Sequence, residues 1–498
     1  MAALGLPPAV QRLLPALGSD PVWLVGGAVR DLLLGRATAD FDFAVQGDGL
    51  ALGRRLANAL GADYYDLDAS RSTGRLLLTT GEAQKTTFDF ATLRGGGIAQ
   101  DLALRDFTVN AMAIALDPSG AVGALIDPLQ GSQDLRQKLL KPCSADSVDN
   151  DPIRAVRAVR LAVDLGLRLD PETTAQIRRA RPTLGRVSPE RLRDEFFRLL
   201  DGQGPGAALR LLEHLGLIDE ILPELEAVRG LAQPAPHAFD VFEHSLATVD
   251  HLAKLAALLS GRSGKPEAGH LAEASALVRL GPYQTRLAAY LDFSPSYGRP
   301  RRSLLLWTAL LHDCGKARSQ AVDDEGRIRF FGHETVGSRI AVEASRRLRL
   351  SLVELAEVET TVLHHMRPEW LEAEGEPTRR AVYRFFRAAE TTGPSVTLLS
   401  VADLQARYVP PVPAPEWDRR VALAGRLLQA WFEERNAVVF PEPLLTGDDI
   451  MRLGGLRPGP EVGRVIEALR EAQAAGEVST RDEAEAFVRT FIEPGTRG

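Results

Sequence analysis

The chain has 498 residues, a formal net charge of −7, 45% hydrophobic residues and 25% charged residues, an ordinary globular composition long enough for roughly three domains. No apolar run reaches the length of a membrane span, and the N-terminus lacks the basic and then apolar order of a secretion signal, so we expect a cytoplasmic protein. The net charge argues against a uniformly basic nucleic-acid coat, although residues 151–200 carry eleven Arg against seven Asp and Glu. Two distant cysteines, Cys143 and Cys314, exclude a disulfide framework and a thiolate zinc site, and we expect inert core thiols.

From Val22 to about Leu140, short apolar runs with β-strand character alternate with helical segments. The expected strands cover residues 22–26, 41–45, 75–80, 86–93 and 111–116. This alternation predicts an N-terminal α/β head built on a small mixed sheet.

The first expected strand ends in the glycine pair Gly26 and Gly27, and a helical stretch over residues 28–34 follows. Without Cβ atoms, the two glycines let the backbone approach a polyphosphate closely, and the helix N-terminus offers unpaired N–H groups to anionic oxygens. Arg30 lies one turn into the helix, where it reaches the same phosphates. The pattern predicts a phosphate-binding turn.

Asp40 and Asp42 flank a phenylalanine in the next expected strand, and Asp89 lies between two phenylalanines in a later one. Side chains alternate between the faces of a strand, so the three carboxylates share the face opposite the aromatic core. Like charges this close repel unless a divalent cation lies between them. We therefore expect two Mg²⁺ ions here, one lowering the pKa of an attacking hydroxyl and one neutralising a triphosphate, as phosphoryl or nucleotidyl transfer requires.

From Asp151 onward we expect helices and no strands, because apolar residues recur at helical spacing. A Pro-containing stretch at 231–239 marks a boundary, and the segments 295–302 and 409–417 have the composition of linkers or surface loops. The fold class that we expect is α+β, with the α/β head followed by an all-helical body.

Six motifs occur in a fixed order, GGAVRD, DFD, RDFTVNA, DPLQG, DPIR and ERLRDE. This order resembles the class II tRNA nucleotidyltransferase family, which includes CCA-adding enzymes and bacterial poly(A) polymerases, over roughly the first 230 residues. The resemblance implies template-independent addition of nucleotides to the 3′ end of a tRNA. It also implies that Asp127 and Gly131 form the hinge of the head.

The resemblance implies that Arg105, Asp106 and Asn110 bind the ribose and phosphates of the incoming nucleotide. The carboxylate of Asp106 suits a sugar hydroxyl, and the amide of Asn110 can donate or accept. Arg157 is a candidate for the triphosphate, whereas we expect Arg160 to lie on a solvated helix face.

Asp151 and Arg154 are expected three residues apart on one helix face, where they would form a protein template for the base. Cytosine offers an N4 donor to Asp151, and its N3 and O2 accept from Arg154. The resemblance implies that Glu190, Arg191 and Arg193 steady this template.

Two departures from the family pattern stand out. Asn150 occupies the place before the template aspartate where the family usually has Glu, and only a short span, GGGIAQDLAL, separates Arg94 from Arg105. Family members that add the terminal A have a longer flexible loop there, so the short span favours CC addition from CTP. Complete CCA addition, with ATP as a further substrate, and poly(A) synthesis stay as alternatives.

A second constellation of metal-ligating residue types lies in the helical region. Its members are His244, His312, Asp313, His333, His364, His365 and Asp403. Imidazole with carboxylate suits a divalent transition metal such as Ni²⁺, Mn²⁺, Co²⁺ or Fe²⁺.

This series resembles the HD phosphohydrolase superfamily over roughly residues 237–410, with LLHDCGK as the core signature. The resemblance implies a one-metal set of His244, His312, Asp313 and Asp403. A second ion would be held by His333 and by one or both of His364 and His365, and Lys316 would contact a phosphate.

A metal-bound hydroxide at this centre would hydrolyse phosphoesters such as 2′,3′-cyclic or 2′-phosphate tRNA ends. The remaining histidines have no motif, and we expect them to be structural or exposed: His214, His237, His251 and His270.

Four domains follow: a nucleotidyltransferase head at 1–140, a helical neck with the base template at 141–230, an HD domain at 231–410 and a helical tRNA-binding tail at 411–498. Gly459 and Gly463 in the tail would admit an RNA phosphate or simply allow packing. The alternative hypothesis from a different functional class is an HD phosphohydrolase whose N-terminal domain only binds RNA. The intact set of Asp40, Asp42 and Asp89 argues against this alternative.

Overall fold

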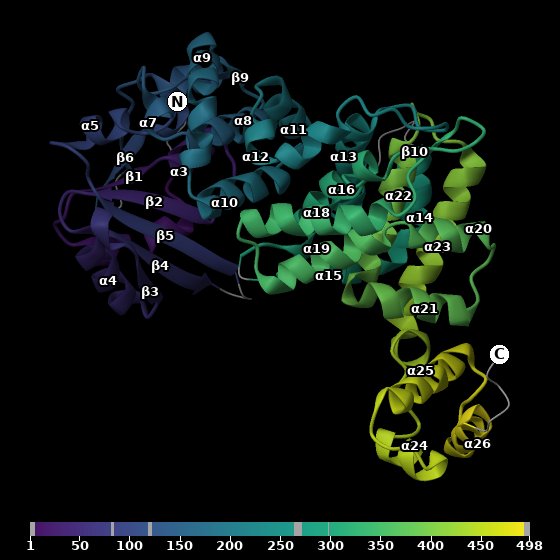
Figure 1. The fold of residues 1–498 in the computed structure, drawn as a ribbon. Coiled ribbons are helices and arrows are strands. Elements are labelled where there is room, and N and C mark those ends of the chain that lie inside the picture. The colour runs from purple at the N-terminus through teal and green to yellow at the C-terminus, as the bar shows by residue number, and fades with distance from the viewer. Residues whose placement is uncertain (1–4, 81–83, 118–121, 263–270, 297, 493–498) are drawn as a thin grey trace. The chain divides into compact units, whose positions relative to one another are not determined.

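The computed structural model describes residues 5–80, 84–117, 122–262, 271–296 and 298–492. Two compact units make up the chain, the first formed by Met1–Ser188 with Leu211–Glu220 and the second by Pro189–Arg210 with Ile221–Gly498 (Figure 1). No described helix combines the length and the apolar character that crossing a membrane demands.

The first unit contains a seven-stranded mixed sheet with the strand order β3-β4-β5-β2-β1-β6-β7. Strands β2 and β5 run parallel, and the other neighbours are antiparallel. The strands are β1 (Val22–Val25), β2 (Asp40–Val45), β3 (Asp63–Asp68), β4 (Thr73–Thr80), β5 (Gln84–Thr92), β6 (Ala113–Leu116) and β7 (Val122–Ile126). With the helices that follow it, this mixed sheet confirms the expected α+β class.

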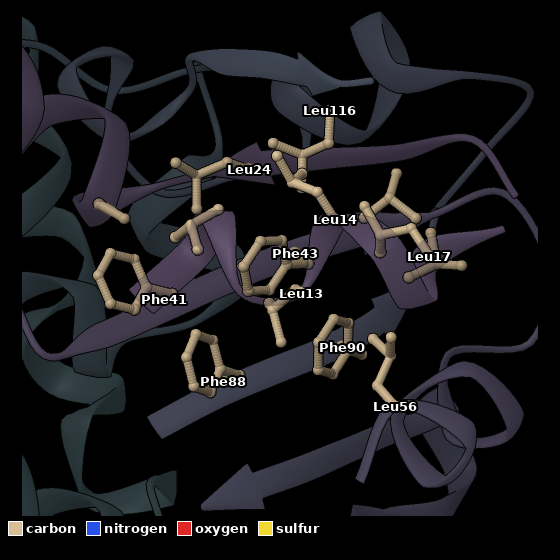
Figure 2. Close-up of a cluster of buried hydrophobic side chains, with 14 of the residues drawn as sticks. Leu13, Leu14, Leu17, Leu24, Phe41, Phe43, Leu56, Phe88, Phe90 and Leu116 are labelled. Atoms are coloured by element: carbon tan, nitrogen blue, oxygen red, sulfur yellow. The ribbon is translucent and has the colours of Figure 1, made fainter. Parts of the chain in front are cut away.

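The alternation of aromatic and acidic residues in β2 and β5 decides which face of the sheet is buried. Phe41, Phe43, Phe88 and Phe90 stack in the core beneath α4 (Gly49–Leu60), with the Phe43 and Phe90 ring centroids 4.9 Å apart (Figure 2). Side chains between them in the sequence point to the other face, because strand residues alternate. The aromatic core thus fixes the orientation of the aspartates.

Replacing Phe43 with Ala should therefore destabilise the first unit by about 3–5 kcal/mol, since the change leaves a cavity among stacked rings. Denaturant-dependent hydrogen exchange of the amides of β1 and β2 measures the loss in this unit alone. Leu34→Ala is the matched control, because Leu34 is 40% exposed and its truncation should change the free energy of unfolding by less than about 0.5 kcal/mol.

Several strands lie where the sequence predicted none. The edge strand β3 has the polar sequence DYYDLD, which lacks an apolar period-two pattern, and it forms by pairing with β4. Beyond Asp151, where no strands were expected, β9 (Arg168–Leu169) pairs with the earlier strand β8 (Leu139–Leu140), and β10 (Ala321–Val322) pairs with β11 (Ile328–Arg329). Two-residue strands leave no periodicity, so the expectation of helices alone was wrong there.

Helices account for the rest of the first unit. They are α1 (Pro8–Gln11), α2 (Leu14–Leu17), α3 (Gly27–Leu33), α4, α5 (Ile98–Ala103), α6 (Gly131–Arg136), α7 (Ser147–Asn150), α8 (Ile153–Leu165) and α9 (Pro171–Ala180). Two further helices reach across the division of the chain, α11 (Pro205–His214) and α12 (Ile218–Ile221).

The second unit is almost entirely helical. Its helices are α10 (Pro189–Leu200), α13 (Val241–Leu259), α14 (Leu271–Leu280), α15 (Gln284–Asp292), α16 (Arg301–Leu311), α17 (Lys316–Ser319), α18 (His333–Arg347), α19 (Leu352–His364), α20 (Arg367–Ala373), α21 (Arg379–Ala389), α22 (Gly393–Ala406), α23 (Ala414–Glu433), α24 (Gly447–Gly454), α25 (Pro460–Ala475) and α26 (Arg481–Ile492). Helix α22 is buried almost throughout and packs against α13 and α23, while α24, α25 and α26 share a separate apolar core.

Candidate functional site

The three carboxylates of the head lie on adjacent strands of its sheet. Asp42 on β2 is paired directly with Asp89 on β5, and Asp40 precedes Asp42 by two residues on the same face. Neighbouring strands are about 4.8 Å apart, so the Asp42 and Asp89 side chains are close neighbours. The sequence expectation of one shared face agrees with this register.

The charges in this group act on one another. The carboxyl group of Asp42 is crowded by protein atoms although the residue keeps an accessible surface, and this desolvation raises its pKa. The negative charges of Asp89 and Asp40 raise the pKa further, against the opposing charge of Arg105. A set of oxygen donors that repel one another fits Mg²⁺, which prefers carboxylate ligands and relieves the repulsion.

The predicted phosphate-binding turn lies beside Asp42. Gly26 adopts a φ of +75°, and a Cβ atom there would lie 3.2 Å from Oδ2 of Asp42 and 3.1 Å from Nη1 of Arg105. A side chain at this position would be strained and would crowd the carboxylate, which explains the glycine. Gly27 begins α3, and Arg30 in this helix donates from Nη1 to Oδ1 of Asn110 at 2.6 Å.

A hydrogen-bonded network joins the residues expected to hold the nucleotide. The buried carboxylate of Asp106 accepts from Nδ2 of Asn110 at 3.2 Å and from Nη1 of Arg157 at 3.1 Å. Burial raises the pKa of Asp106, but Arg157 and the hydrogen bonds outweigh it, so the pKa lies below its usual value. Arg30, Asn110, Asp106 and Arg157 therefore form one continuous chain of contacts, and Asp106 stays ionised.

The expected base template differs in one respect from the sequence interpretation. Asp151 is not on a helix: it has extended backbone angles between α7 and α8, and only Arg154 lies in α8. The proline that follows disfavours helical angles at the residue before it. The two side chains still face each other, with Nε of Arg154 4.0 Å from Oδ2 of Asp151. Nη1 of Arg154 donates to the carbonyl of Arg105 at 3.1 Å and to Oγ of Ser147 at 2.8 Å.

The span between Arg94 and Arg105 is short and held at both ends. Five residues, 93–97, separate β5 from α5. The buried carboxylate of Asp101 accepts from the backbone N–H of Arg94 at 3.2 Å, from its Nε at 3.0 Å and from Nη2 of Arg105 at 3.1 Å. Asp101 carried no sequence signal, because a lone aspartate in a short helix is usually solvated.

The neighbouring hinge residues also have local roles. Asp127 accepts from the backbone N–H groups of Gly131 at 2.7 Å and of Ser132 at 2.9 Å. A Cβ on Gly131 would lie 2.0 Å from the carbonyl oxygen of Thr108, so only glycine fits. This turn fastens α6 to the segment that carries Asp106 and Asn110.

In the second unit, the histidines and aspartates of the HD series converge from separate helices. His244, His312 and Asp313 offer ligand atoms within 4.8 Å of one another, and so do Asp313, His333 and His365. Asp313 belongs to both groups, so it can bridge two ions. Asp403 joins the first group, with Oδ1 2.9 Å from Nε2 of His244 and 3.8 Å from Nε2 of His312.

His364 is not brought together with these residues. The helix α19 turns its side chain away, and Nδ1 of His364 accepts from Nε of Arg367 at 3.1 Å. His365, one residue on, is buried, with Nε2 3.7 Å from Oδ1 of Asp313. Adjacent helical residues point about 100° apart, so only one of the pair can face the centre.

The Nδ1 atoms of the histidine rings face backbone carbonyl oxygens. Nδ1 atoms lie against backbone carbonyl oxygens, at 2.8 Å for His312, 2.8 Å for His333, 2.6 Å for His365 and 3.3 Å for His244. A carbonyl can only accept, so these contacts favour the proton on Nδ1 and leave Nε2 as the ligand atom in His312, His333 and His365, whereas Nε2 of His244 also lies 2.9 Å from Oδ1 of Asp403. The Nε2 atoms of His333 and His365 lie 3.2 Å apart, and Nε2 of His312 is buried without a hydrogen bond from any described residue. Such converging lone pairs fit a divalent transition metal.

Further residues surround this centre. Nζ of Lys316 pairs with Oδ2 of Asp313 at 2.6 Å, so its charge is engaged within the protein. Arg407 donates to Oδ2 of Asp403 at 2.8 Å and orients that carboxylate. His237, expected to be structural or exposed, lies with its ring 5.3 Å from that of His244, and burial lowers its pKa to about 4. It was missed because its segment is rich in proline and resembles a linker.

The remaining candidates lie on α10 and at or within α25. Glu190 and Arg191 are exposed on α10, and Arg193 donates to the carbonyl of Arg349 at 2.7 Å. Gly459 precedes α25 with extended angles that any residue can adopt, and a Cβ on Gly463 would meet open space, so neither position requires glycine.

The two cysteines fit the expectation of inert thiols. Burial raises the pKa values of the Cys143 and Cys314 thiols, Cys143 to about 12, so neither forms a thiolate at neutral pH.

Comparisons with known proteins identify the domains of the chain. Family models match as the Poly A polymerase head domain over residues 22–141, the Probable RNA and SrmB- binding site of polymerase A over residues 166–228 and the HD domain over residues 241–406. Among solved structures, a CCA-adding enzyme complexed with ATP aligns with a TM-score of 0.61 at 20% identity over 98% of this chain and 97% of that chain. The CCA-adding enzyme of Thermotoga maritima complexed with tRNA aligns with a TM-score of 0.56 at 21% identity over 98% and 97% of the two chains. At these identities the likeness shows the fold.

Two curated relatives match almost end to end. The chain is 37% identical to the A-adding tRNA nucleotidyltransferase of Deinococcus radiodurans over 95% of this chain and 96% of that protein. It is 35% identical to the CC-adding tRNA nucleotidyltransferase of Thermus thermophilus over 93% and 92% of the two chains. These matches show that the chain belongs to the tRNA nucleotidyltransferase family and carries an HD domain.

Proposed function

We propose that the protein adds two cytidines to the 3′ end of tRNA, using CTP. The attacking 3′-oxygen forms a bond to the α-phosphorus, the bond to the β-phosphate oxygen breaks, pyrophosphate departs and the hydroxyl proton is lost to a base. Asp40, Asp42 and Asp89 would hold two Mg²⁺ ions, which supply activation of the hydroxyl and neutralisation of the triphosphate when bound. The observation that carries this proposal is the in-register pair Asp42 and Asp89 beside Gly26.

The chain's own residues position the nucleotide. The turn at Gly26 and Gly27 with Arg30 would bind the triphosphate, and the network around Asp106 would receive the sugar. Asp151 and Arg154 would select the base. Nε of Arg154 lies 4.0 Å from Oδ2 of Asp151, and in this arrangement the carboxylate would accept from cytosine N4 while the guanidinium would donate to N3 and O2.

The short span between Arg94 and Arg105 supports cytidine as the added base. Asp101 ties Arg94 and Arg105 together, and Arg154 donates to the carbonyl of Arg105. The template is thus anchored to a clamped segment rather than to a long loop. A template held in one shape accepts one base, because a second shape would break this set of charge-assisted hydrogen bonds.

A-addition is the second candidate, since the relative that is 37% identical is named as A-adding. An A-adding enzyme would extend only a tRNA that already ends in CC. The two candidates therefore differ in both the primer and the nucleotide that they use.

We further propose that the HD centre hydrolyses phosphoesters at RNA ends, such as 2′,3′-cyclic phosphates. Four histidines whose Nε2 atoms converge with Asp313 support a two-metal centre that activates water. Lys316, now paired with Asp313, would meet the phosphate.

The deciding experiment runs three reactions with the purified full chain: a tRNA lacking its end with CTP, the same tRNA with CTP and ATP, and a tRNA ending in CC with ATP. We expect extension by two residues in the first two reactions and no extension in the third, read at single-nucleotide resolution on a gel. Addition of A to the CC-ended tRNA would overturn CC addition. Failure to extend any primer would overturn nucleotide transfer itself.

A further inference from the structure

A row of side chains crosses the head sheet from its edge to the metal-binding carboxylates. Tyr65 on β3 pairs with Arg75 on β4, Arg75 pairs with Asp89 on β5, and Asp89 pairs with Asp42 on β2. Directly paired residues lie on the same face of a sheet. The row therefore runs along the face opposite the aromatic core, over four neighbouring strands.

The row is accessible along its length. Tyr65 is 39% exposed, the Arg75 side chain is 31% exposed and the Asp89 side chain is 17% exposed. Nε and Nη2 of Arg75 donate to the two oxygens of Asp89 at 2.7 and 2.6 Å. A guanidinium has five N–H donors, and the Tyr65 side chain also hydrogen-bonds to Arg75, so two donors are left for another acceptor. The pKa of Arg75 is raised, chiefly by Asp89, so its charge is permanent.

The chemistry of nucleotide transfer indicates from which side of Asp42 the attacking hydroxyl comes. The phosphate-binding turn lies on the β1 side of Asp42, because a Cβ on Gly26 would be 3.2 Å from its Oδ2. In phosphoryl transfer, the attacking and leaving oxygens stand in line on opposite sides of the phosphorus. With the departing pyrophosphate on the β1 side, the attacking hydroxyl comes from the β5 side, where the row continues to Arg75 and Tyr65.

We propose that Arg75 and Tyr65 bind the last nucleotide of the RNA that is being extended, Arg75 through its phosphate and Tyr65 by stacking on its base. This inference rests on the proposed nucleotide transfer. A guanidinium suits a phosphodiester, and an exposed tyrosine ring beside it suits a base. Stacking tolerates any base, which suits a 3′ end whose last base changes after each addition.

The test measures the RNA and the nucleotide separately. Tyr65→Leu should raise the KM for the tRNA primer about tenfold, the loss expected for one stacked base, with the KM for CTP unchanged. Tyr65→Phe keeps the ring and should restore the wild-type KM. Leu67→Ser is the matched control, since Leu67 is 43% exposed two residues further along β3 and should leave both KM values unchanged.

Arg75→Lys separates phosphate binding from the positioning of Asp89. Loss of the bidentate pair alone would lower kcat and raise the Mg²⁺ requirement at an unchanged KM for RNA. We expect the KM for RNA to rise as well. An unchanged KM for RNA in Tyr65→Leu, or an equal rise in Leu67→Ser, overturns the inference. Absence of extension by the wild-type chain would instead refute the proposed transfer, so the two failures are distinct.

Discussion

Asp42→Asn is expected to lower the rate of nucleotide addition by at least about a thousandfold, because it removes the central carboxylate of the head site while keeping its shape. Asp42 is the residue that pairs with Asp89 across β2 and β5 and lies next to Gly26. A neutral amide cannot replace a charged ligand shared by two cations. Single-turnover extension of a tRNA lacking its end, with saturating CTP, measures the chemical step directly.

The same substitution should not weaken the fold. The pKa of Asp42 is raised in the folded protein, so its proton binds more tightly there than in the unfolded chain, and the ionised carboxylate at neutral pH costs stability. Asn removes that cost. The free energy of unfolding of the first unit should therefore stay equal or rise, which separates lost chemistry from lost structure.

Asp66→Asn is the matched control for this prediction. Asp66 is also a strand aspartate in the head, and its carboxylate pairs at the surface with Arg54 at 3.2 Å. Exposed pairs contribute little, so both the rate and the stability should stay near wild type. Near-normal extension by Asp42→Asn would show that the carboxylate triad is not the site of transfer.

The head site follows from its sequence to the extent that strand alternation governs it. The period of two in DFD and FDF places phenylalanines on one face and aspartates on the other, and the stacked core shows this arrangement. Local alternation therefore predicts correctly which side chains of β2 and β5 share a face of the sheet. It does not predict the strand order, because the pairing partner of β2 depends on packing across the whole sheet.

The sequence did not predict the residues whose roles depend on tertiary contacts. Arg75 and Asp101 are single charged residues in ordinary segments, and their importance arises only when folding brings them to Asp89 and to Arg105. His237 lies in a proline-rich stretch, yet its ring meets that of His244. Spacing along the chain predicts neighbours within one element, whereas these contacts join different elements.

The pair His364 and His365 shows the same limit at the second centre. The sequence placed two adjacent histidines near the HD signature, and helical geometry allows only one to face the cluster. The structure turns His365 towards Asp313 and His364 towards Arg367. The choice depends on the rotation of α19 in its packing, which no local pattern encodes.

His365→Gln is accordingly expected to remove about one bound divalent ion per chain and to lower metal-dependent phosphoester hydrolysis by at least about a hundredfold. The reason is geometric: Nε2 of His365 lies 3.2 Å from Nε2 of His333 and shares Asp313 with it, and an amide cannot supply the imidazole lone pair. Metal content of the purified full chain by mass spectrometry and hydrolysis of a 2′,3′-cyclic nucleotide give two independent readouts.

His364→Gln is the matched control, one residue away on the same helix, and it should keep the wild-type metal content and hydrolysis. CTP-dependent extension should be unchanged in both variants, because the two centres use different residues. Equal metal loss in both variants would mean that α19 as a whole, rather than the imidazole of His365, supports the centre. Full metal content in His365→Gln would show that His365 is not a metal ligand. The prediction rests on its position, because the buried imidazole has Nδ1 against a backbone carbonyl and Nε2 3.7 Å from Oδ1 of Asp313.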